Sequence, residues 1–306
     1  MRSSLRVLML ATSYPKYAGD TTAPFIEEIA AGVASHGVQV RMLLPFHRDF
    51  RHAPVERNVE LATFRYAPIP ALAIWGYAES LQADVGLRVN ALYAAPFALV
   101  ASMYALDAHI RAFRPDVIHA HWVLPNGLPV ALLAKLHGIP YVVSMHGSDV
   151  AMAERNGVFR GLTRRIFAGC AYATACSGDL HRRAIALGAN PDTTVVLPYG
   201  VAPQEFSPEL RDRDWVASRF AIAHDAPLLV AVGRFVMKKG FHVLIQALPQ
   251  IRQHVPHAKL LLVGYGDMHN AYVTRAQELG VADMLVIAGQ LLRDDVARAI
   301  ASADVY

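Results

Sequence analysis

The chain of 306 residues contains only two cysteines, Cys170 and Cys176. Two cysteines are too few for a disulfide framework, and no second pair completes the spacing of a zinc site. Charged residues are also scarce, at 18% of the chain against 54% hydrophobic residues, and this composition excludes extended disorder. We therefore expect a globular protein of two domains that works in the reducing cytoplasm.

Long apolar runs are missing as well. The longest nearly apolar stretch, residues 91–106, contains Pro96 and is shorter than the roughly 20 residues that span a bilayer. The apolar stretch at the N-terminus is short, is interrupted by Thr12 and Ser13, and lacks a small-residue cleavage pattern. It is predicted to be a first core strand, and no membrane-spanning helix is expected.

The small net charge of +4 is unevenly placed, because its basic excess lies in residues 151–200. Four arginines there alternate at helical spacing with apolar residues: Arg155, Arg160, Arg164 and Arg165 with Phe159, Leu162, Ile166 and Phe167. Two interpretations stay open, a helix in peripheral contact with the anionic inner face of a membrane and a core helix with a solvated basic face. The sequence has no pattern of a nucleic-acid module, so no nucleic-acid partner is expected.

Short apolar segments alternate with amphipathic ones along most of the chain. The first series predicts, among others, a strand at RVLMLATS, a helix from Pro24 to Gly37, a helix over 84–113 and a helix over 126–137 that ends at Gly138. A second series starts at residue 228, after the polar stretch FSPELRDRDW, which resembles a linker. This rhythm predicts two doubly wound α/β domains with parallel sheets, over residues 1–205 and 206–306.

Ligands of such sheets bind beyond the carboxyl ends of the strands, so the residues there are candidates for the site. The first candidate is VGRFVMKKG, where Arg234 and Lys239 precede a helix N-terminus that itself favours anions. A phosphate chain suits this pair, although loop cations are often merely solvated. The segment is neither a Walker loop nor a dinucleotide fingerprint.

Three more strand ends carry polar residues or turn glycines. His119 and His121 share one face of a predicted strand, and a metal pair or structural histidines are both open interpretations. His146 and Asp149 follow the next strand, and Gly200 is predicted to form a tight turn with Pro198.

The order of seven motifs resembles the retaining glycosyltransferase family 4 of GT-B fold over nearly the whole chain. The motifs are HAHW, SMHGSD, ACSGDL, VVLPYGVAPQEFSP, AVGRFVMKKG, LLLVGYGD and VIAGQLLRDDVARAIASADVY. The resemblance implies two Rossmann-like domains that face a cleft, a nucleotide-sugar donor bound to the C-terminal domain and an acceptor bound to the N-terminal domain. It also implies sugar transfer with retention and without a metal or another cofactor.

The resemblance assigns roles to single residues. Arg234 and Lys239 match the positions that hold the donor diphosphate and stabilise the leaving group. His121 matches the histidine beside the donor sugar, and His119, His146, Asp149 and Gly200 border the cleft. The remaining matches are glycines that let the backbone approach the nucleotide: Gly19, Gly264, Gly266 and Gly289.

Two departures from the family pattern limit these expectations. The loop near Gly19 has one glycine where the family often has two, and the chain ends before the family's paired glutamates. We therefore expect an incomplete second domain and impaired turnover for this chain. A non-catalytic GT-B scaffold and a nucleotide-sugar epimerase remain as alternatives. The acceptor is expected to be a carbohydrate or a lipid-linked molecule of polysaccharide biosynthesis.

Overall fold

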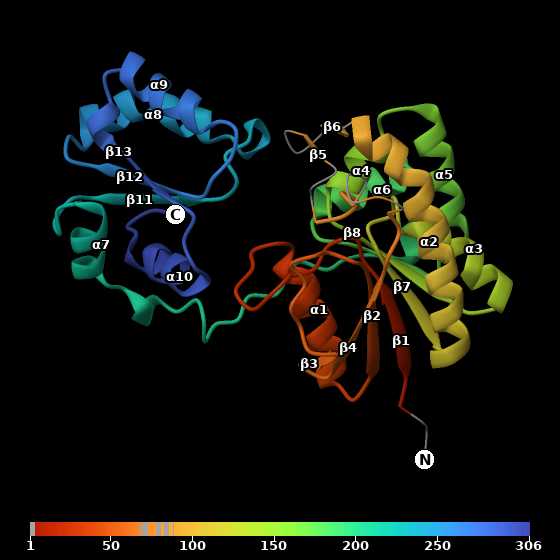
Figure 1. The fold of residues 1–306 in the computed structure, drawn as a ribbon. Coiled ribbons are helices and arrows are strands. Elements are labelled where there is room, and N and C mark those ends of the chain that lie inside the picture. Colours follow the sequence, from red (N-terminus) through yellow and green to blue (C-terminus); the bar gives the residue numbers. More distant parts are fainter. Residues whose placement is uncertain (1–3, 68, 70–72, 78–80, 83–85, 88) are drawn as a thin grey trace. The chain divides into compact units, whose positions relative to one another are not determined.

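The computed structural model describes residues 4–67, 69, 73–77, 81–82, 86–87 and 89–306. The chain divides into two compact units, Met1–Gly200 (unit 1) and Val201–Tyr306 (unit 2) (Figure 1). The division lies slightly before the boundary expected between residues 205 and 206. Each unit has its own sheet and its own apolar cores, so each is described by itself.

Unit 1 is built on one sheet with the strand order β10-β9-β8-β7-β1-β2-β4-β3. Neighbouring strands run parallel, except for the short hairpin of β3 and β4. The strands are β1 Arg6–Leu10, β2 Gln39–Pro45, β3 Val55–Glu56, β4 Val59–Phe64, β7 Val117–His121, β8 Tyr141–Met145, β9 Tyr172–Ala175 and β10 Thr194–Val196, with a separate pair β5 Leu81–Gln82 and β6 Gly86–Leu87.

Helices cover both faces of this sheet because its strands are apolar on both sides. In β1, Val7 and Met9 face a core shared with α1, whereas Leu8 and Leu10 face a core shared with α2, α3, α4, α5 and α6. The helices are α1 Pro24–Ser35, α2 Val89–Phe113, α3 Gly127–His137, α4 Ser148–Ala153, α5 Gly157–Gly169 and α6 Gly178–Ala186. The predicted doubly wound arrangement is thus confirmed for this unit.

Unit 2 repeats the arrangement on a smaller parallel sheet, β11-β12-β13. One face of the sheet packs on α8 and α9, and the other packs on α7 and α10. The elements are α7 Arg213–Phe220, β11 Leu228–Val232, α8 Phe241–His254, β12 Lys259–Val263, α9 His269–Glu278, β13 Leu285–Gly289 and α10 Arg293–Ser302. Short 3-10 turns of unit 2 lie at Pro208–Leu210, Met237–Lys239 and Ala282–Met284, and unit 1 has one at Pro191–Thr193.

Several predicted helix boundaries agree with the structure. Helix α1 begins at Pro24, and Gly37 follows it with a positive φ of 77°. Helix α3 ends at Gly138, whose left-handed conformation closes the last turn. The helix predicted over 84–113 is observed as α2 from Val89, and its first part was wrong because Gly86–Leu87 form strand β6 instead; residues 84, 85 and 88 lie outside the described residues. No helix in the described part of the chain combines the length and hydrophobicity needed to cross a bilayer.

The stretch expected to be a linker is instead tied into unit 2. The buried guanidinium of Arg213 donates hydrogen bonds to the carbonyl oxygens of His224 and Ser302, at 2.9 and 3.2 Å, and to that of Ala226. Since these carbonyls come from a loop and from the end of α10, Arg213 joins distant parts of the unit. The polar composition of this stretch predicted exposed residues, but Arg213 is buried.

Candidate active site

Three histidine rings cluster at the carboxyl ends of β7 and β8 in unit 1. His119 and His121 lie on the same face of β7, as predicted, with ring centroids 4.1 Å apart. His146, the first residue after β8, places its Nε2 3.2 Å from Nδ1 of His121. Although His121 is the last residue of β7, the structure buries it completely.

Hydroxyl groups hold the two ends of this cluster. Nε2 of His119 lies 2.7 Å from the hydroxyl of Ser144, which lies 2.7 Å from the hydroxyl of Thr174. At the other end, the phenol oxygen of Tyr199 lies 2.5 Å from Nδ1 of His146. Sequence reasoning missed Tyr199, although it stands beside the selected Gly200 after the last strand.

Aromatic side chains surround His146. Phe25, in the first turn of α1, stacks on Tyr199 at 4.6 Å and lies 5.0 Å from His146 between ring centroids. Trp122 packs edge-on against His146 at 4.8 Å and adopts a positive φ of 67°, which is uncommon for a bulky residue. Such a conformation often occurs at functional sites. The sequence signals that went unused were the bulky residues beside Pro24 and His121.

Burial keeps the three histidines neutral at physiological pH. It lowers the pKa of His119 to about 4 and that of His146 to about 3. The pKa of His121 lies well below its ordinary value, because burial and then the two neighbouring histidines disfavour its charged form. Nε2 of His121 is buried and has no hydrogen-bond partner among the residues that the structure describes. Among the described residues, no group of three or more His, Cys, Asp or Glu side chains could hold a metal ion.

Asp149 holds the backbone of the loops that carry the histidine cluster. Its Oδ2 accepts a hydrogen bond from the amide of Val123 at 2.8 Å, and its Oδ1 accepts from the amides of His146 and Gly147 at 3.1 and 3.0 Å. The side chain is buried, so it joins the loops after β7 and β8 and does not face open space. Burial raises the pKa of this carboxyl group, and the backbone amides oppose that shift.

The two other glycines selected in unit 1 differ in their conformations. Gly19 has a φ of 86° and open space around it, in a loop held by Asp20, whose carboxylate accepts hydrogen bonds from the amides of Lys16 and Thr22. The N-terminus of α1 follows, with no side-chain cap. Gly200 lies in an irregular segment without a positive φ, and the tight turn predicted there is not formed.

In unit 2, Arg234 and Lys239 both belong to the loop from β11 to α8. A Cβ added to Gly233 would lie 3.9 Å from Cδ of Lys239, so the lysine stem runs beside the residue that precedes Arg234. Lys239 is exposed and Arg234 is half-buried. Helix α8 starts after Gly240 without a side-chain cap or an acidic residue in its first turn. Cations and a helix N-terminus therefore meet at one strand end.

Close backbone packing explains two of the selected glycines in unit 2. A Cβ on Gly264 would lie 1.9 Å from the carbonyl oxygen of Gly233, and one on Gly266 would lie 2.6 Å from the carbonyl oxygen of Phe235. Both glycines also have positive φ values, 143° and 151°. Gly289 has a φ of 72° but nothing within 4 Å. Gly264 and Gly266 are therefore required by backbone packing, whereas Gly289 is the one of these three glycines with open space around the position of a Cβ.

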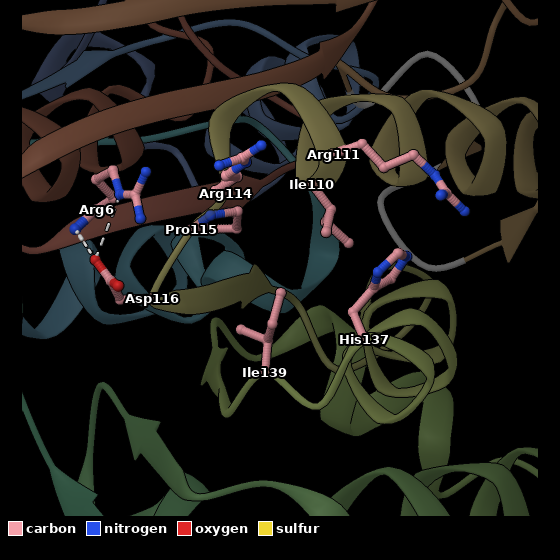
Figure 2. Close-up of a pocket in the computed structure, with 8 residues that line it drawn as sticks. All are labelled: Arg6, Ile110, Arg111, Arg114, Pro115, Asp116, His137 and Ile139. Atoms are coloured by element: carbon pink, nitrogen blue, oxygen red, sulfur yellow. Dashed lines mark hydrogen bonds and ion pairs between the residues drawn. The ribbon is translucent and has the colours of Figure 1, made fainter.

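A separate groove of about 430 Å³ lies at the opposite, amino-terminal edge of the unit 1 sheet (Figure 2). Its lining comes from the start of β1, the residues before β7 and the ends of α2 and α3: Arg6, Ile110, Arg111, Arg114, Pro115, Asp116, His137 and Ile139. Arg6 and Asp116 pair with each other there, at 3.6 Å. Since the three histidines lie at the carboxyl ends of β7 and β8, at the other edge of this sheet, the groove does not belong to the histidine cluster.

Comparisons with known proteins identify the family. The family model described as "Glycosyl transferase 4-like domain" matches residues 21–200, more than half of the chain, and "Glycosyl transferases group 1" matches residues 214–306. The chain is 25% identical over 309 residues to the Bacillus subtilis glycosyltransferase TuaC, named for teichuronic acid biosynthesis, and covers 99% of itself and 74% of TuaC. It is 32% identical to a Mycobacterium tuberculosis mannosyltransferase named GDP-mannose-dependent alpha-(1-6)-phosphatidylinositol monomannoside mannosyltransferase, over 58% of this chain and about half (47%) of that protein.

Solved structures show the same fold at low sequence identity. Anabaena HepE, crystallised with UDP and glucose, matches 98% of the chain and 72% of its own with a TM-score of 0.67 at 15% identity. Sucrose-phosphate synthase from Thermosynechococcus elongatus matches 98% of the chain and 74% of its own with a TM-score of 0.70 at 17% identity. Both carry the GT-B fold expected from the sequence. The chain therefore belongs to the glycosyl transferase 4-like family and is a glycosyltransferase.

Proposed function

We propose that the protein transfers a sugar from a nucleoside diphosphate sugar to a carbohydrate or lipid-linked acceptor, with retention of the anomeric configuration and without a metal ion. The bond from the sugar to the diphosphate breaks, a bond from the sugar to the oxygen of an acceptor hydroxyl forms on the same face, and the proton of that hydroxyl passes to the departing diphosphate. A relative named for its dependence on GDP-mannose and a structural neighbour crystallised with UDP and glucose support a nucleotide-linked donor.

The observation that carries the proposal is the group of cations at the end of β11. Arg234 and Lys239 leave the same strand end as the uncapped N-terminus of α8. A guanidinium can hold two phosphate oxygens in a fork, and an ammonium adds a mobile charge. The helix N-terminus adds free amides and a positive dipole. Together these groups suit a diphosphate, which we assign to unit 2.

The same groups are proposed to take the place of a metal ion. The leaving diphosphate gains negative charge as the sugar departs, and fixed positive groups stabilise that charge in the transition state. Two cationic side chains and a helix dipole can supply this stabilisation, which metal ions supply in other transferases. Transfer that continues in EDTA is the expected result.

Unit 1 is proposed to bind the acceptor and to supply polar groups to the sugar. Nε2 of His121 is buried and makes no hydrogen bond to the described residues, so one of its ring nitrogens keeps an unused hydrogen-bonding capacity beside the proposed sugar site. The hydroxyls of Ser144 and Thr174 and the carboxylate of Asp149 hold the surrounding loops. The acceptor itself is proposed to bind near this cluster.

A transfer assay tests the proposed function. The protein is incubated with UDP-glucose or GDP-mannose, with and without EDTA, and with lipid-linked saccharide acceptors, and release of the nucleoside diphosphate is measured. Proton NMR of the product then reads the anomeric configuration. A changed sugar without transfer would identify an epimerase, and binding without release would identify a scaffold. Inversion or full loss of transfer in EDTA would contradict the proposed mechanism.

We also propose that unit 1 contacts an anionic membrane surface in the cytoplasm. Helix α2 has an unusual outer face, where Tyr93, Phe97, Val100 and Tyr104 are 48–77% exposed at helical spacing. The outer face of a helix in a soluble domain is normally polar. Aromatic side chains such as these are favoured at a membrane–water interface.

The charge of the same helix layer favours lipid over a second copy of the chain. Helices α2, α3 and α5 pack over one core and together carry Arg111, Lys135, Arg160, Arg164 and Arg165 against a single acid, Asp107. Two such layers would repel each other, whereas anionic lipid would attract both. The apolar residues Ile166 and Phe167 of α5 are buried, whereas its arginines Arg160, Arg164 and Arg165 are exposed together with Val158.

Vesicle co-sedimentation tests this contact. We expect binding to vesicles that contain phosphatidylglycerol, weaker binding to neutral vesicles and loss of binding at high salt. The Phe97→Ser/Tyr104→Ser variant should bind several-fold more weakly, because it removes apolar area from the exposed face. The control Val55→Ser removes a residue that is also 57% exposed, in β3 at the far edge of the sheet, and should bind normally. Equal binding by all three proteins would contradict the proposal.

A further inference from the structure

Ring nitrogens and a phenol form one continuous chain in unit 1. The hydroxyl of Tyr199 lies 2.5 Å from Nδ1 of His146, and Nε2 of His146 lies 3.2 Å from Nδ1 of His121. The chain ends at Nε2 of His121, which is buried and unpartnered. A neutral imidazole carries one proton on one of its two nitrogens, so the position of each proton in this chain depends on its neighbour.

Only two proton arrangements satisfy both hydrogen bonds. In the first, Tyr199 donates to His146, Nε2–H of His146 donates to His121, and His121 carries its proton on Nε2. In the second, every direction is reversed, and Nε2 of His121 is a bare acceptor. The direction of the hydrogen bond at Tyr199 therefore decides whether Nε2 of His121 is a hydrogen-bond donor or an acceptor.

The proton of the Tyr199 hydroxyl selects between these arrangements. In the second arrangement this proton would need another acceptor, either water, since Tyr199 is 39% exposed, or the thiol of Cys176, whose sulfur accepts only weakly. Both carboxylate oxygens of Asp149 already accept backbone amides. The imidazole nitrogen of His146, at 2.5 Å, is the better acceptor.

We propose that Tyr199 is a positioning residue that acts through His146 to hold His121 in the tautomer with its proton on Nε2. His121 is then a buried hydrogen-bond donor, prepared for an oxygen atom of a ligand and not for a cation. The identity of that oxygen rests on the proposed function, in which it belongs to the sugar or to its acceptor. The tautomer itself does not depend on any ligand.

Nitrogen-15 NMR of the full chain, labelled at its histidines and free of nucleotide, measures the tautomer directly. In the wild-type protein we expect His121 to show a protonated Nε2 and a bare Nδ1. Tyr199→Phe keeps the ring but removes the donated proton, so both arrangements become similarly satisfied. We expect His121 to become a mixture of both tautomers in this variant, with a several-fold rise of the Nδ1–H form.

Two further variants make the result specific. Tyr172→Phe removes another phenol, 54% exposed at the start of β9, and should leave the His121 signal unchanged. Cys176→Ala removes the weaker acceptor and should also leave it unchanged. His181, whose Nε2 lies 3.0 Å from the carbonyl oxygen of Thr194, should keep its protonated Nε2 in every variant and so reports that unit 1 stays folded.

The possible outcomes are distinct. A bare Nε2 on His121 in the wild-type protein would overturn the proposal, as would a His121 signal that does not respond to Tyr199→Phe while His181 keeps its signal. If His181 also changes, Tyr199→Phe has disturbed the fold, and the wild-type tautomer alone decides. Since no sugar is present, absence of glycosyl transfer would contradict the proposed function and would leave this result intact.

Discussion

Gly264, which follows β12, and Gly289, the last residue of β13, should respond very differently to the same substitution. In Gly264→Ala, the new Cβ would lie 1.9 Å from the carbonyl oxygen of Gly233 and 2.9 Å from its carbonyl carbon. Ordinary contacts begin near 3.5 Å, so two backbone segments must separate by roughly 1.5 Å. The φ of 143° is also disfavoured for alanine. We expect the free energy of unfolding of unit 2 to fall by about 3–5 kcal/mol.

Gly289→Ala is the matched control. Gly289 also has a positive φ, 72°, but an added Cβ would meet nothing within 4 Å. Its cost is therefore that of a left-handed alanine, about 1–2 kcal/mol. If the open space above Gly289 receives the nucleotide, this variant should lose nucleotide affinity by more than it loses stability.

Urea unfolding followed by tryptophan fluorescence measures both effects. The chain has three tryptophans, and Trp75→Phe with Trp122→Phe leaves Trp215 as the reporter of unit 2. Similar losses for Gly264→Ala and Gly289→Ala would refute the assignment of Gly264 to backbone packing. So would a loss below about 1 kcal/mol for Gly264→Ala, because the left-handed strain alone reaches that size.

Three other changes test the remaining contacts. Asp149→Asn places an NH₂ group against a backbone amide and should lower the stability of unit 1 by about 2 kcal/mol in urea titrations; no change would mean that its carboxylate is not shared by the loops. Because burial holds the pKa of His119 and His146 below the 6.5 of an unfolded chain, the unfolded state takes up protons first as the pH falls. Unit 1 should lose about 1.5 kcal/mol per histidine between pH 6.5 and pH 5, and constant stability over this range would contradict their burial. Arg213→Leu leaves carbonyls unpaired and should destabilise unit 2 by about 3 kcal/mol, whereas Arg219→Ala, at an exposed side chain, should change it by less than about 1 kcal/mol.

The architecture could be predicted from the sequence because it depends on periodicity and on chain breaks. Strands such as RVLML are apolar on both faces and predict a parallel sheet covered by helices. Pro24 and Gly138 mark helix ends through their own φ preferences, which act locally.

The positions of the site residues could be predicted only in part. Histidines spaced by two residues lie on one face of a strand, so the pairing of His119 with His121 followed from geometry. The contacts of Tyr199 and Phe25 with His146 join segments that are far apart in sequence. No local pattern encodes such contacts, because they arise only when the strand order of the sheet is known.

The burial of polar side chains was the property that could be predicted least well from the sequence. Polar residues are normally exposed, so Arg213 was read as part of a linker and Asp149 as part of an open cleft. The structure buries both because backbone groups from several segments satisfy them. The outer face of α2 is the reverse case, in which apolar residues that suggest a core are exposed.

Binding of UDP and GDP by isothermal titration calorimetry tests the central claim most directly. Arg234→Ala and Lys239→Ala should each weaken binding about 10- to 100-fold, since a hydrogen bond to a charged group contributes about 1.5–3 kcal/mol. The control Lys238→Ala, which removes an exposed cation from the same loop, should stay within about threefold of the wild-type affinity under the same salt conditions. Unchanged affinity in Arg234→Ala and Lys239→Ala, or an equal loss in Lys238→Ala, would contradict the assignment of the diphosphate to these two side chains.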